Sequence, residues 1–445
     1  MSEHCAYVVV LSQLRKHPNA DKLKIATFFG NDTCVPIDAA EGEIGIYFPV
    51  DLQLSEEFCL ENHLLRKKPD GTPDTGYMDP NKRNVTAIRL RGEKSEGVFL
   101  PLSCIAYTGV NLDEVNVGDT ITELNGHEIC KKYIPIRKHS SNVKNKINKT
   151  RKIKVPISPL FVEHADTEQL AYNIDAFKPG DLVEITLKMH GTSGRTGYLP
   201  LLQPRTLLDK ILRRTRKEYG YVSGTRRVVL DEEHAGGFYE DNAFRHYMAA
   251  KFENKLHRGE TAYYEIVGFQ GPNGAPIMSS VKNSKISDKA FTKQYGEETV
   301  FAYGCDATNG YEDEHPCCEL YVYRMTMVND DGDVVDYSPA QIRYRCEQMG
   351  VKVVPQFEVF VIPQDEPHPG EYVVRKVEEY YDGPDPIGKT HVREGVVARI
   401  LNRNNFAVYK MKNWSFKCLE GIVKDEAAEP DMEEAQEELV EEQTE

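Results

Sequence analysis

The sequence lacks the features that mark exported, membrane-spanning or zinc-binding proteins. Its 445 residues include ten cysteines and one tryptophan, and no two cysteines have the CxxC spacing of a zinc or redox site. No apolar run approaches the ~18–20 residues that a membrane helix needs. The opening stretch MSEHCAYVVVLSQ also lacks the charged, apolar and small-residue order of a signal peptide. We therefore expect a cytoplasmic protein with free thiols and no membrane partner.

Negative charge is unevenly distributed along the chain. Lysine and arginine number 55 against 70 acids, which gives a net charge of −15. Residues 425–445 carry 11 of the acids and no lysine or arginine, so the remainder is only −4 (−15 plus 11). Such a segment cannot bury enough apolar surface to fold, and we predict a disordered acidic tail there. At roughly 100–200 residues per domain, the length indicates two or three domains.

Positive charge gathers in two segments. Residues 131–154 hold ten lysines or arginines and no acid, which predicts a basic linker and favours a polyphosphate partner through counterion release. A solvated connector explains the same pattern equally well. Residues 205–220 have leucines and isoleucine at helical spacing, with Arg213 and Arg214 near the end. They predict a surface helix, and RNA contact by these arginines is the functional hypothesis.

The first 125 residues have the pattern of a small β-barrel. Short β-rich runs such as YVVVL, KIATFF, GIYFPV, VTAIRL and GVFLPL alternate with turn residues, which is typical of such barrels. Residues 66–83 form a basic loop that we expect to be mobile. Arg89, Arg91 and Lys94 follow on a strand and turn, where they are candidates for phosphate contact.

Four stretches further along carry charged residues on predicted strands. LVEITL leads into KMHGTSGR, which places Lys188 at a strand end beside small residues. TAYYEIVGF is an alternating strand with Glu265, and REGVVARI is a β-rich run with Glu394. FAVYKMKNW carries Lys410 and Lys412 two positions apart, so that both side chains face one way. A lysine pair aimed inward is poor core material and suits phosphate binding.

The order of these stretches resembles the ATP-dependent RNA ligases of the covalent nucleotidyltransferase superfamily, over about residues 159–420. The KxHG form, with His190 where many relatives have aspartate, is similar to the RNA ligase 2 branch. The resemblance implies Lys188 as the nucleophile. It implies that Glu265 and Glu394 hold ribose hydroxyls or Mg²⁺ (or Mn²⁺). The remaining residues that it implies for ATP or AMP binding are His190, Gly191, Arg226 (preferred over Arg227), Tyr323 (preferred over Tyr321), Lys410 and Lys412.

The N-terminal region carries a second resemblance. HPNADKLKIATF, residues 17–28, resembles the opening of tRNA-binding OB domains appended to some aminoacyl-tRNA synthetases. Residues 45–55 and 87–102 look like the N-terminal OB modules of certain bacterial and phage RNA ligases. An OB module of this kind presents strands to nicked or single-stranded nucleic acid. Only 33 residues follow Lys412, which leaves no room for the C-terminal OB domain of DNA ligases and capping enzymes.

Together these observations predict an α+β protein in four parts. Residues 1–125 form an OB-like β-barrel, 126–158 a basic linker, 159–424 an antiparallel-sheet nucleotidyltransferase domain and 425–445 a disordered tail. The predicted function is sealing of 3′-hydroxyl and 5′-phosphate RNA ends through a lysyl-AMP intermediate, with a nicked duplex or a tRNA-like partner, in a bacterial or phage-infected cell. The alternatives are an RNA-binding OB protein with a degenerate nucleotidyl site, and a DNA ligase or capping-type nucleotidyltransferase.

Overall fold

The protein divides into two compact units. The computed structural model describes residues 4–420 except 51, 69–70, 73, 134–157, 159, 165–166, 203–216, 227, 231–238, 240–241, 287, 330 and 404–405. The first unit consists of residues 1–140, 283–294 and 417–445, and the second of residues 141–282 and 295–416. Most of the predicted linker and basic helix, and all of the acidic tail, lie outside the described residues. The described ends of the first two segments differ from the prediction, since residues 127–128 and 130–132 of the linker and 217–220 of the helix are in strands.

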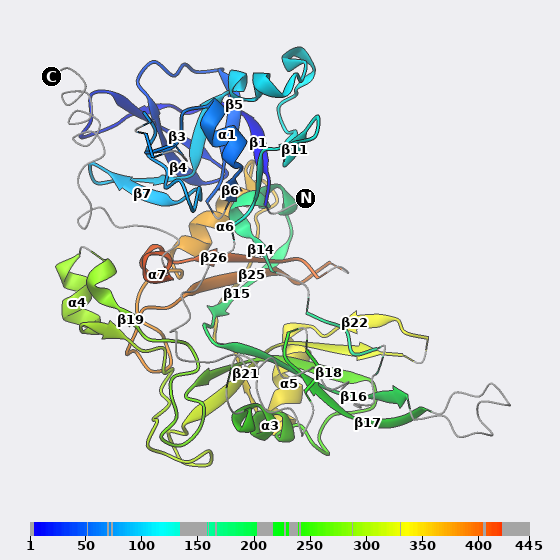
Figure 1. The fold of residues 1–445 in the computed structure, drawn as a ribbon. Coiled ribbons are helices and arrows are strands. Elements are labelled where there is room, and N and C mark those ends of the chain that lie inside the picture. Colours follow the sequence, from blue (N-terminus) through cyan, green and yellow to red (C-terminus); the bar gives the residue numbers. More distant parts are fainter. Residues whose placement is uncertain are drawn as a thin grey trace. The chain divides into compact units, whose positions relative to one another are not determined.

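The first unit is built mainly of short antiparallel strands around one apolar core (Figure 1). The core joins Val8 and Phe48 to Phe58 of a short helix. A four-stranded sheet has the order β10 (Thr120–Ile121), β1 (Ala6–Val10), β5 (Ile44–Phe48), β9 (Val98–Pro101). The other strands and the helix are β2 (Arg15–Lys16), β3 (Leu23–Phe28), β4 (Asn31–Pro36), β6 (Leu52–Leu54), β7 (Ala87–Leu90), β8 (Glu93–Glu96), β11 (Glu123–Leu124), β12 (His127–Glu128), β13 (Cys130–Lys132) and α1 (Glu56–Glu61).

The strands of this unit do not close into one barrel within the described residues, so the predicted OB-like barrel is not confirmed. They form separate sheets, among them β2–β3–β4 and the β7–β8 hairpin. Closure of a barrel would need backbone hydrogen bonds between β4 and β8, and side-chain hydrogen bonds connect these strands instead. The Thr33 hydroxyl donates to the Glu96 carbonyl at 2.8 Å, and the Cys34 N–H donates to Ser95 Oγ at 2.9 Å. Hydroxyl-to-backbone bonds hold the two sheets together without extending either one.

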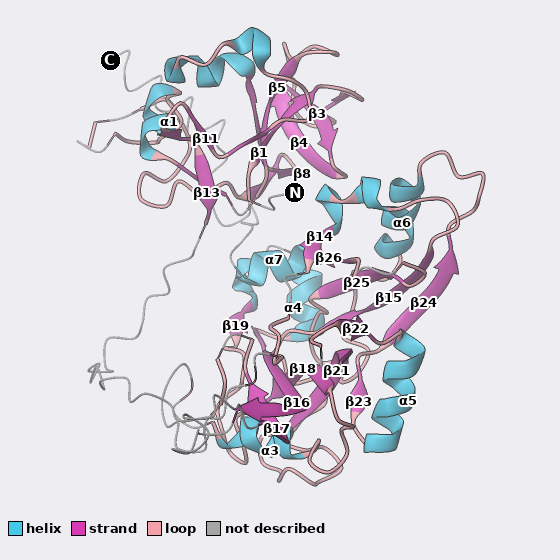
Figure 2. Ribbon diagram, turned by 90° about the vertical axis from the view of Figure 1, so that its right-hand side faces the viewer, coloured by secondary structure: helices cyan, strands magenta, loops and turns pink. Residues whose placement is uncertain are grey.

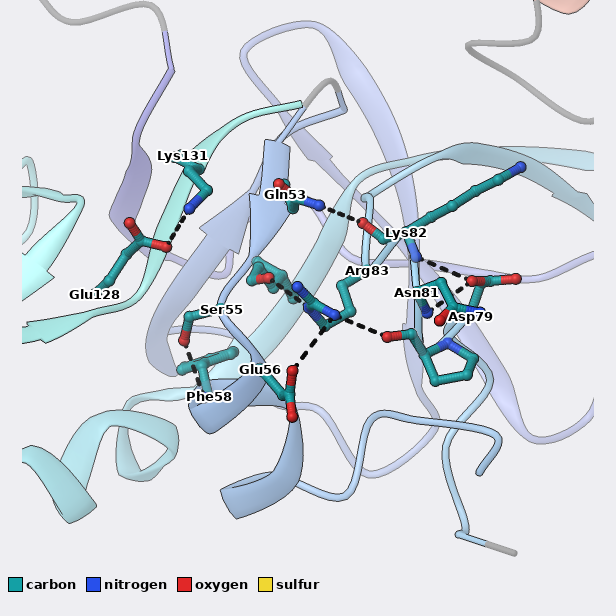
Figure 3. A network of polar contacts seen from close by, with 12 residues as sticks. Gln53, Ser55, Glu56, Phe58, Asp79, Asn81, Lys82, Arg83, Glu128 and Lys131 are labelled. Atoms are coloured by element: carbon teal, nitrogen blue, oxygen red, sulfur yellow. Dashed lines mark hydrogen bonds and ion pairs between the residues drawn. The ribbon is translucent and has the colours of Figure 1, made fainter. Parts of the chain in front are cut away.

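The basic loop 66–83 uses one of its arginines to hold its own turn (Figure 3). Arg83 donates to the Pro80 carbonyl at 2.8 Å and lies 3.8 Å from a carboxylate oxygen of Glu56. The backbone N–H groups of Asn81 and Lys82 donate to Asp79, and these bonds lower the pKa of Asp79. Arg83 therefore serves the turn, whereas the side chain of Lys82 extends away from these contacts.

The second unit contains two larger sheets (Figure 2). One has five strands in the order β14 (Glu168–Gln169), β26 (Val408–Lys412), β25 (Gly395–Ile400), β15 (Leu182–Lys188), β24 (Gln356–Val361). Helix α6 (Pro369–Glu378) packs on it through Val373 and Val377, which join Val183 and Ile185 of β15 in one core cluster. All neighbouring strands pair antiparallel except β14 with β26.

The other large sheet carries two helices on one face. Its order is β17 (Lys217–Gly224), β16 (Thr192–Leu202), β18 (Glu260–Gly268), β21 (Cys318–Val328), β22 (Val334–Asp336), and β23 (Lys352–Val353) also pairs with β21. Helices α3 (Ala243–Ala250) and α5 (Pro339–Met349) pack against β18 through Phe244, Met248 and Ile342. Smaller elements are β19 (Val281–Lys282), β20 (Glu298–Thr299), α4 (Lys289–Tyr295) and α7 (Trp414–Glu420).

The prediction of a mixed α+β fold is confirmed, and so are the predicted strands that carry Lys188, Glu265, Lys410 and Lys412. The predicted alternation of β18 is wrong, because eight of its nine residues are buried. Helices cover one of its faces, and the other faces polar and aromatic residues of the site described below. No helix among the described residues is long and apolar enough to cross a membrane. All ten cysteines are free thiols.

Candidate active site

Three adjacent strands of the five-stranded sheet place two lysines in one row. Lys188, the last residue of β15, pairs with Gly395 of β25, and Gly395 pairs with Lys412 of β26. Residues opposite one another across antiparallel strands point to the same face. The glycine between the lysines is required by close packing, since a Cβ at Gly395 would lie 2.0 Å from the Met411 carbonyl oxygen. The two amines therefore reach the same carboxylate without a side chain between them.

That carboxylate is Glu394, which immediately precedes β25 and is 2% exposed. Its Oε1 lies 2.7 Å from Lys188 Nζ and 3.4 Å from Lys412 Nζ. Burial alone would raise the pKa of Glu394, but the charges of Lys188, Lys412 and His190 lower it to about 2. Sequence analysis placed Lys188 and Glu394 in one site without predicting a direct contact between them. In the structure the direct partner of Lys188 is an anion, and Lys412 shares that anion.

His190 is held edge-on between two phenylalanines. Its ring makes T-shaped contacts with Phe301 at 4.6 Å and Phe416 at 4.7 Å. Nδ1 is 3.7 Å from Glu394 Oε2, which is beyond hydrogen-bond distance. The backbone N–H of His190 donates to the hydroxyl of Tyr303 at 2.7 Å. The connection between β15 and β16 is only three residues long, and these contacts fix its middle residue.

Glu265 approaches the same place from the other sheet. It lies on β18 opposite Ser193 of β16, whose hydroxyl donates to Glu265 Oε2 at 3.2 Å. The backbone N–H of Gly191 also bonds this carboxylate, and burial raises the pKa of Glu265 to about 7. Lys188 opposes that rise and Glu394 adds to it. A Cβ at Gly191 would lie 2.9 Å from Glu265 Cγ, so glycine is needed here for the approach of β18.

Tyr323 occupies an irregularity in β21. Tyr264 pairs with Val322 and Tyr263 pairs with Arg324, so Tyr323 is an extra residue between them. Such a bulge redirects the side chain of the extra residue. Burial, followed by the charge of Glu265, raises the pKa of the Tyr323 hydroxyl, which also bonds Ser193. Tyr321, the alternative, pairs directly with Glu265 in the ladder and is 5% exposed.

A cationic and aromatic cluster adjoins Tyr323. The ring of His164 contacts that of Tyr323 at 5.0 Å, and His164 Nδ1 accepts from Arg324 at 3.3 Å. Burial, followed by the charges of Arg324 and Arg226, lowers the pKa of His164 to about 3. Arg226 acts electrostatically on both His164 and Tyr323. The preferred arginine is therefore beside the preferred aromatic residue, and Arg227 lies outside the described residues.

The structure brings together most, but not all, of the predicted residues. Lys410 shares a strand face with Lys412 and pairs with Val397 and Gln169. The predicted RNA contacts Arg89, Arg91 and Lys94 belong to the first unit. Arg213 and Arg214 are outside the described part of the chain.

Sequence reasoning missed three residues that hold the site. They are Ser193, Tyr303 and Arg245. The guanidinium of Arg245, on α3, donates to the Ser193 carbonyl at 3.1 Å and to Thr192 Oγ1 at 2.5 Å. Ser193 stands in the KMHGTSGR stretch and could have been included. Tyr303 and Arg245 are 113 and 52 residues from their partners, and no local pattern marks them.

Two carboxylates near a lysine fit a hydrated divalent cation better than a resident metal centre. Within the described ranges no group of three or more His, Cys, Asp and Glu residues could hold a metal ion. Glu394 Oε2 is nevertheless buried and makes no hydrogen bond. Mg²⁺ is commonly bound through one or two carboxylates, with water and substrate phosphates as its other ligands. Glu265 and Glu394 suit that arrangement.

Comparison with solved structures identifies the fold. Naegleria gruberi RNA ligase with pyrophosphate matches 94% of this chain and 98% of its own, with a TM-score of 0.56 and 16% sequence identity. Mutants of that ligase with AMP and manganese, and with ATP and manganese, match at TM-scores of 0.56 and 0.55 and identities of 18% and 17%, over the same shares of both chains. No protein-family model and no curated protein sequence matches. The chain therefore has the fold of these RNA ligase structures.

Proposed function

We propose that the protein is an ATP-dependent RNA ligase that joins 3′-hydroxyl and 5′-phosphate ends through a lysyl-AMP intermediate. The observation that carries the proposal is the row Lys188–Gly395–Lys412 with Glu394 bound to both amines. The shared fold supports it, because the similar structures are of an RNA ligase with ATP, AMP or pyrophosphate.

The first step forms one bond and breaks one. Lys188 Nζ, after losing a proton, attacks the α-phosphorus of ATP, and pyrophosphate leaves as the N–P bond forms. Glu394 holds the amine in place at 2.7 Å, which supplies the positioning on which such a displacement depends. Lys412 and Lys410 bind phosphate oxygens and offset their negative charge. Tyr323 stacks on the base, and Arg226 and His190 border the nucleotide.

The two later steps transfer the same AMP. It moves from Lys188 to the 5′-phosphate of RNA, which frees the amine, and the neighbouring RNA 3′-hydroxyl then displaces it as the phosphodiester forms. A divalent cation held by Glu265 and Glu394 would add charge stabilisation on the phosphates. Arg89, Arg91 and Lys94 of the first unit, which we propose is an OB-type module for a nicked duplex or a tRNA-like RNA, contact the RNA backbone. Arg213 and Arg214 belong to the same proposal.

Transfer of radiolabel from α-labelled ATP to the protein tests the first step directly. Wild-type protein should acquire the label, and Lys188→Ala should acquire none. Lys376→Ala is a matched control, since Lys376 also bonds a glutamate, Glu358, at 3.2 Å in the same unit. The control should label normally. Labelling of Lys188→Ala at the control level would remove this lysine from the mechanism.

Intact mass and nick sealing separate the alternatives. One added AMP after incubation with ATP and Mg²⁺ or Mn²⁺ supports a nucleotidyltransferase, whereas the absence of an adduct supports a binding protein with a degenerate site. A labelled nick made in turn of RNA or DNA strands then distinguishes RNA ligase from DNA ligase. No feature of the described site favours either alternative.

A further inference from the structure

The β7–β8 hairpin of the first unit combines three unfavourable features at its tip. Arg89 and Lys94 lie directly opposite each other across the two strands, where like charges destabilise a sheet. Arg91 and Gly92 form the two-residue turn, with φ of +45° and +92°. Positive φ at both positions is the pattern of a type I′ turn, which strongly prefers Asn-Gly. An arginine in the left-handed region is strained, because its Cβ comes too close to the following carbonyl oxygen.

The tip is nevertheless held in one conformation from within and from outside the hairpin. Within it, the Arg89 guanidinium donates to the Gly92 carbonyl at 3.2 Å. The backbone N–H of Asn19 donates to His17 Nδ1 at 3.1 Å, so the neutral imidazole carries its proton on Nε2. That N–H donates to the Leu90 carbonyl at 3.0 Å, while the Asn19 amide donates to the Arg91 carbonyl at 2.9 Å. His17 is completely buried. The side chains of His17 and Asn19 therefore hold the carbonyls of Leu90 and Arg91, which precede and follow the strained φ of Arg91.

Strain that neighbouring residues maintain points to a binding function. The exposed Arg91 stands at the tip of a two-residue turn, with Arg89 and Lys94 on the strands beside it. The two acids of the hairpin face cations elsewhere in the chain, Glu93 facing Arg15 and Glu96 facing Lys417. Three cations on one short hairpin suit contact with the phosphates of a nucleic-acid backbone. A free hairpin would gain stability from asparagine in place of arginine. The conformation of the turn therefore does not account for the arginine.

We propose that His17 and Asn19 are positioning residues that hold Arg91 for contact with an RNA phosphate. This inference rests on the proposed RNA-joining function. His17 and Asn19, here called the clamp, act through the conformation of the turn. Loss of the clamp therefore weakens RNA binding and leaves nucleotide transfer to Lys188 intact.

Arg91→Asn separates binding from stability. Asn-Gly suits the turn, so the variant should unfold at an equal or higher temperature than wild type. Its affinity for a nicked RNA duplex should fall about tenfold at low salt, and the slope of log K against log salt should shrink by about 0.9 for one lost phosphate contact. Unchanged affinity and slope, measured by fluorescence anisotropy, would overturn the proposal.

Asn19→Ala tests the clamp, with Asn62→Ala as its matched control. The Asn62 amide likewise donates to two backbone carbonyls of the first unit, those of Phe58 and Cys104, at 2.9 and 3.0 Å. Asn19→Ala should weaken RNA binding several-fold and Asn62→Ala should not. In the double variant Asn19→Ala with Arg91→Asn the two losses should not add, because one acts through the other. Additive losses of RNA affinity, or equal weakening by Asn62→Ala, would show that the clamp only stabilises the fold.

Transfer of label to Lys188 distinguishes failure of the ligase proposal from failure of the clamp proposal. All the hairpin variants should take up AMP at the wild-type rate. If the wild-type protein takes up no AMP, the ligase proposal fails, while the binding measurements still decide whether the clamp positions Arg91. If Asn19→Ala loses AMP uptake along with RNA binding, the clamp does not act through the hairpin and the inference is wrong.

Discussion

Glu265 and Glu394 are two carboxylates beside one lysine, and their surroundings drive their pKa values in opposite directions. Burial raises the pKa of Glu265 to about 7, whereas three cationic neighbours outweigh burial and lower the pKa of Glu394 to about 2. Glu394 is therefore ionised at any physiological pH. Glu265 changes charge near neutrality in the ligand-free protein, which makes it the pH-sensitive member of the pair.

Replacing Glu265 with glutamine should change how stability depends on pH. An acid whose folded pKa is raised contributes stability below its unfolded pKa and loses it as pH rises through the folded value. From pH 5 to pH 8 the wild type should therefore lose roughly 1–3 kcal/mol that Glu265→Gln retains, at ~1.4 kcal/mol per pKa unit with allowance for partial exposure. Urea unfolding at both pH values measures this. Parallel pH profiles for the two proteins would contradict the assignment.

Tyr303 supports the residues that follow Lys188. Tyr303→Phe removes the acceptor of the His190 N–H, and an unsatisfied buried donor costs about 1–3 kcal/mol. We expect lower unfolding free energy and slower AMP uptake. Tyr107→Phe is the control, because the Tyr107 hydroxyl is buried without a hydrogen-bond partner and its removal should be neutral. Comparable losses in both variants would show that the hydrogen bond to the His190 N–H is not the cause.

Strands β25 and β26 lie close together at Gly395. Its φ of +150° and the 2.0 Å approach of a hypothetical Cβ to the Met411 carbonyl leave no room for alanine. Gly395→Ala should displace the strand that carries Lys412, lower stability by more than ~1 kcal/mol and abolish AMP uptake. Gly296→Ala has a positive φ of +78° but open space around it, and should cost only about 1 kcal/mol. Stability and label transfer measured on both variants check the comparison.

Strand positions could be predicted from the sequence wherever β-branched and aromatic residues run between turn residues. The strands that carry Lys188, Glu265 and Lys412 were predicted in this way, whereas the roles of these residues came from the resemblance to RNA ligases. The bulge at Tyr323 could not be predicted, because it depends on a register shift against Tyr263 and Tyr264. The predicted barrel is not confirmed for a similar reason. Strand patterns show that strands exist, but the hydroxyl bonds of Thr33 and Ser95 decide which strand edges meet.

The grouping of the chain into two units also could not be read from local patterns. Residues 283–294 and 417–445 belong to the unit formed by the first 140 residues, although they are far from it in sequence. Lys417 lies 2.9 Å from Glu96 at the end of β8, and Lys285 donates to the Leu419 carbonyl at 2.7 Å. Composition finds segments, but it does not reveal that distant segments share one unit.

The Lys417–Glu96 ion pair should contribute more to stability than an exposed ion pair with a similar distance between its charged atoms. Their side chains are 19% and 12% exposed, against 57% and 48% for Lys131 and Glu128, which lie 2.8 Å apart. Lys417→Met should cost about 1–3 kcal/mol, because it leaves a largely buried carboxylate without its partner. Lys131→Met should cost less than about 1 kcal/mol. Thermal unfolding of the two variants checks this, and equal shifts would contradict it.

The link Met189–His190–Gly191 carries the chain from the sheet of Lys188 directly into the sheet of Glu265. Each sheet has its own backbone hydrogen bonds and its own core, and the ion pair of Arg343 on α5 with Glu184 on β15, at 2.8 Å, joins the two layers. Under the proposed mechanism, a nucleotide held by lysines of one sheet and by Tyr323 and Glu265 of the other would add a second connection between them. Reaction at Lys188 would make that connection covalent, and transfer of AMP to RNA would break the covalent bond again.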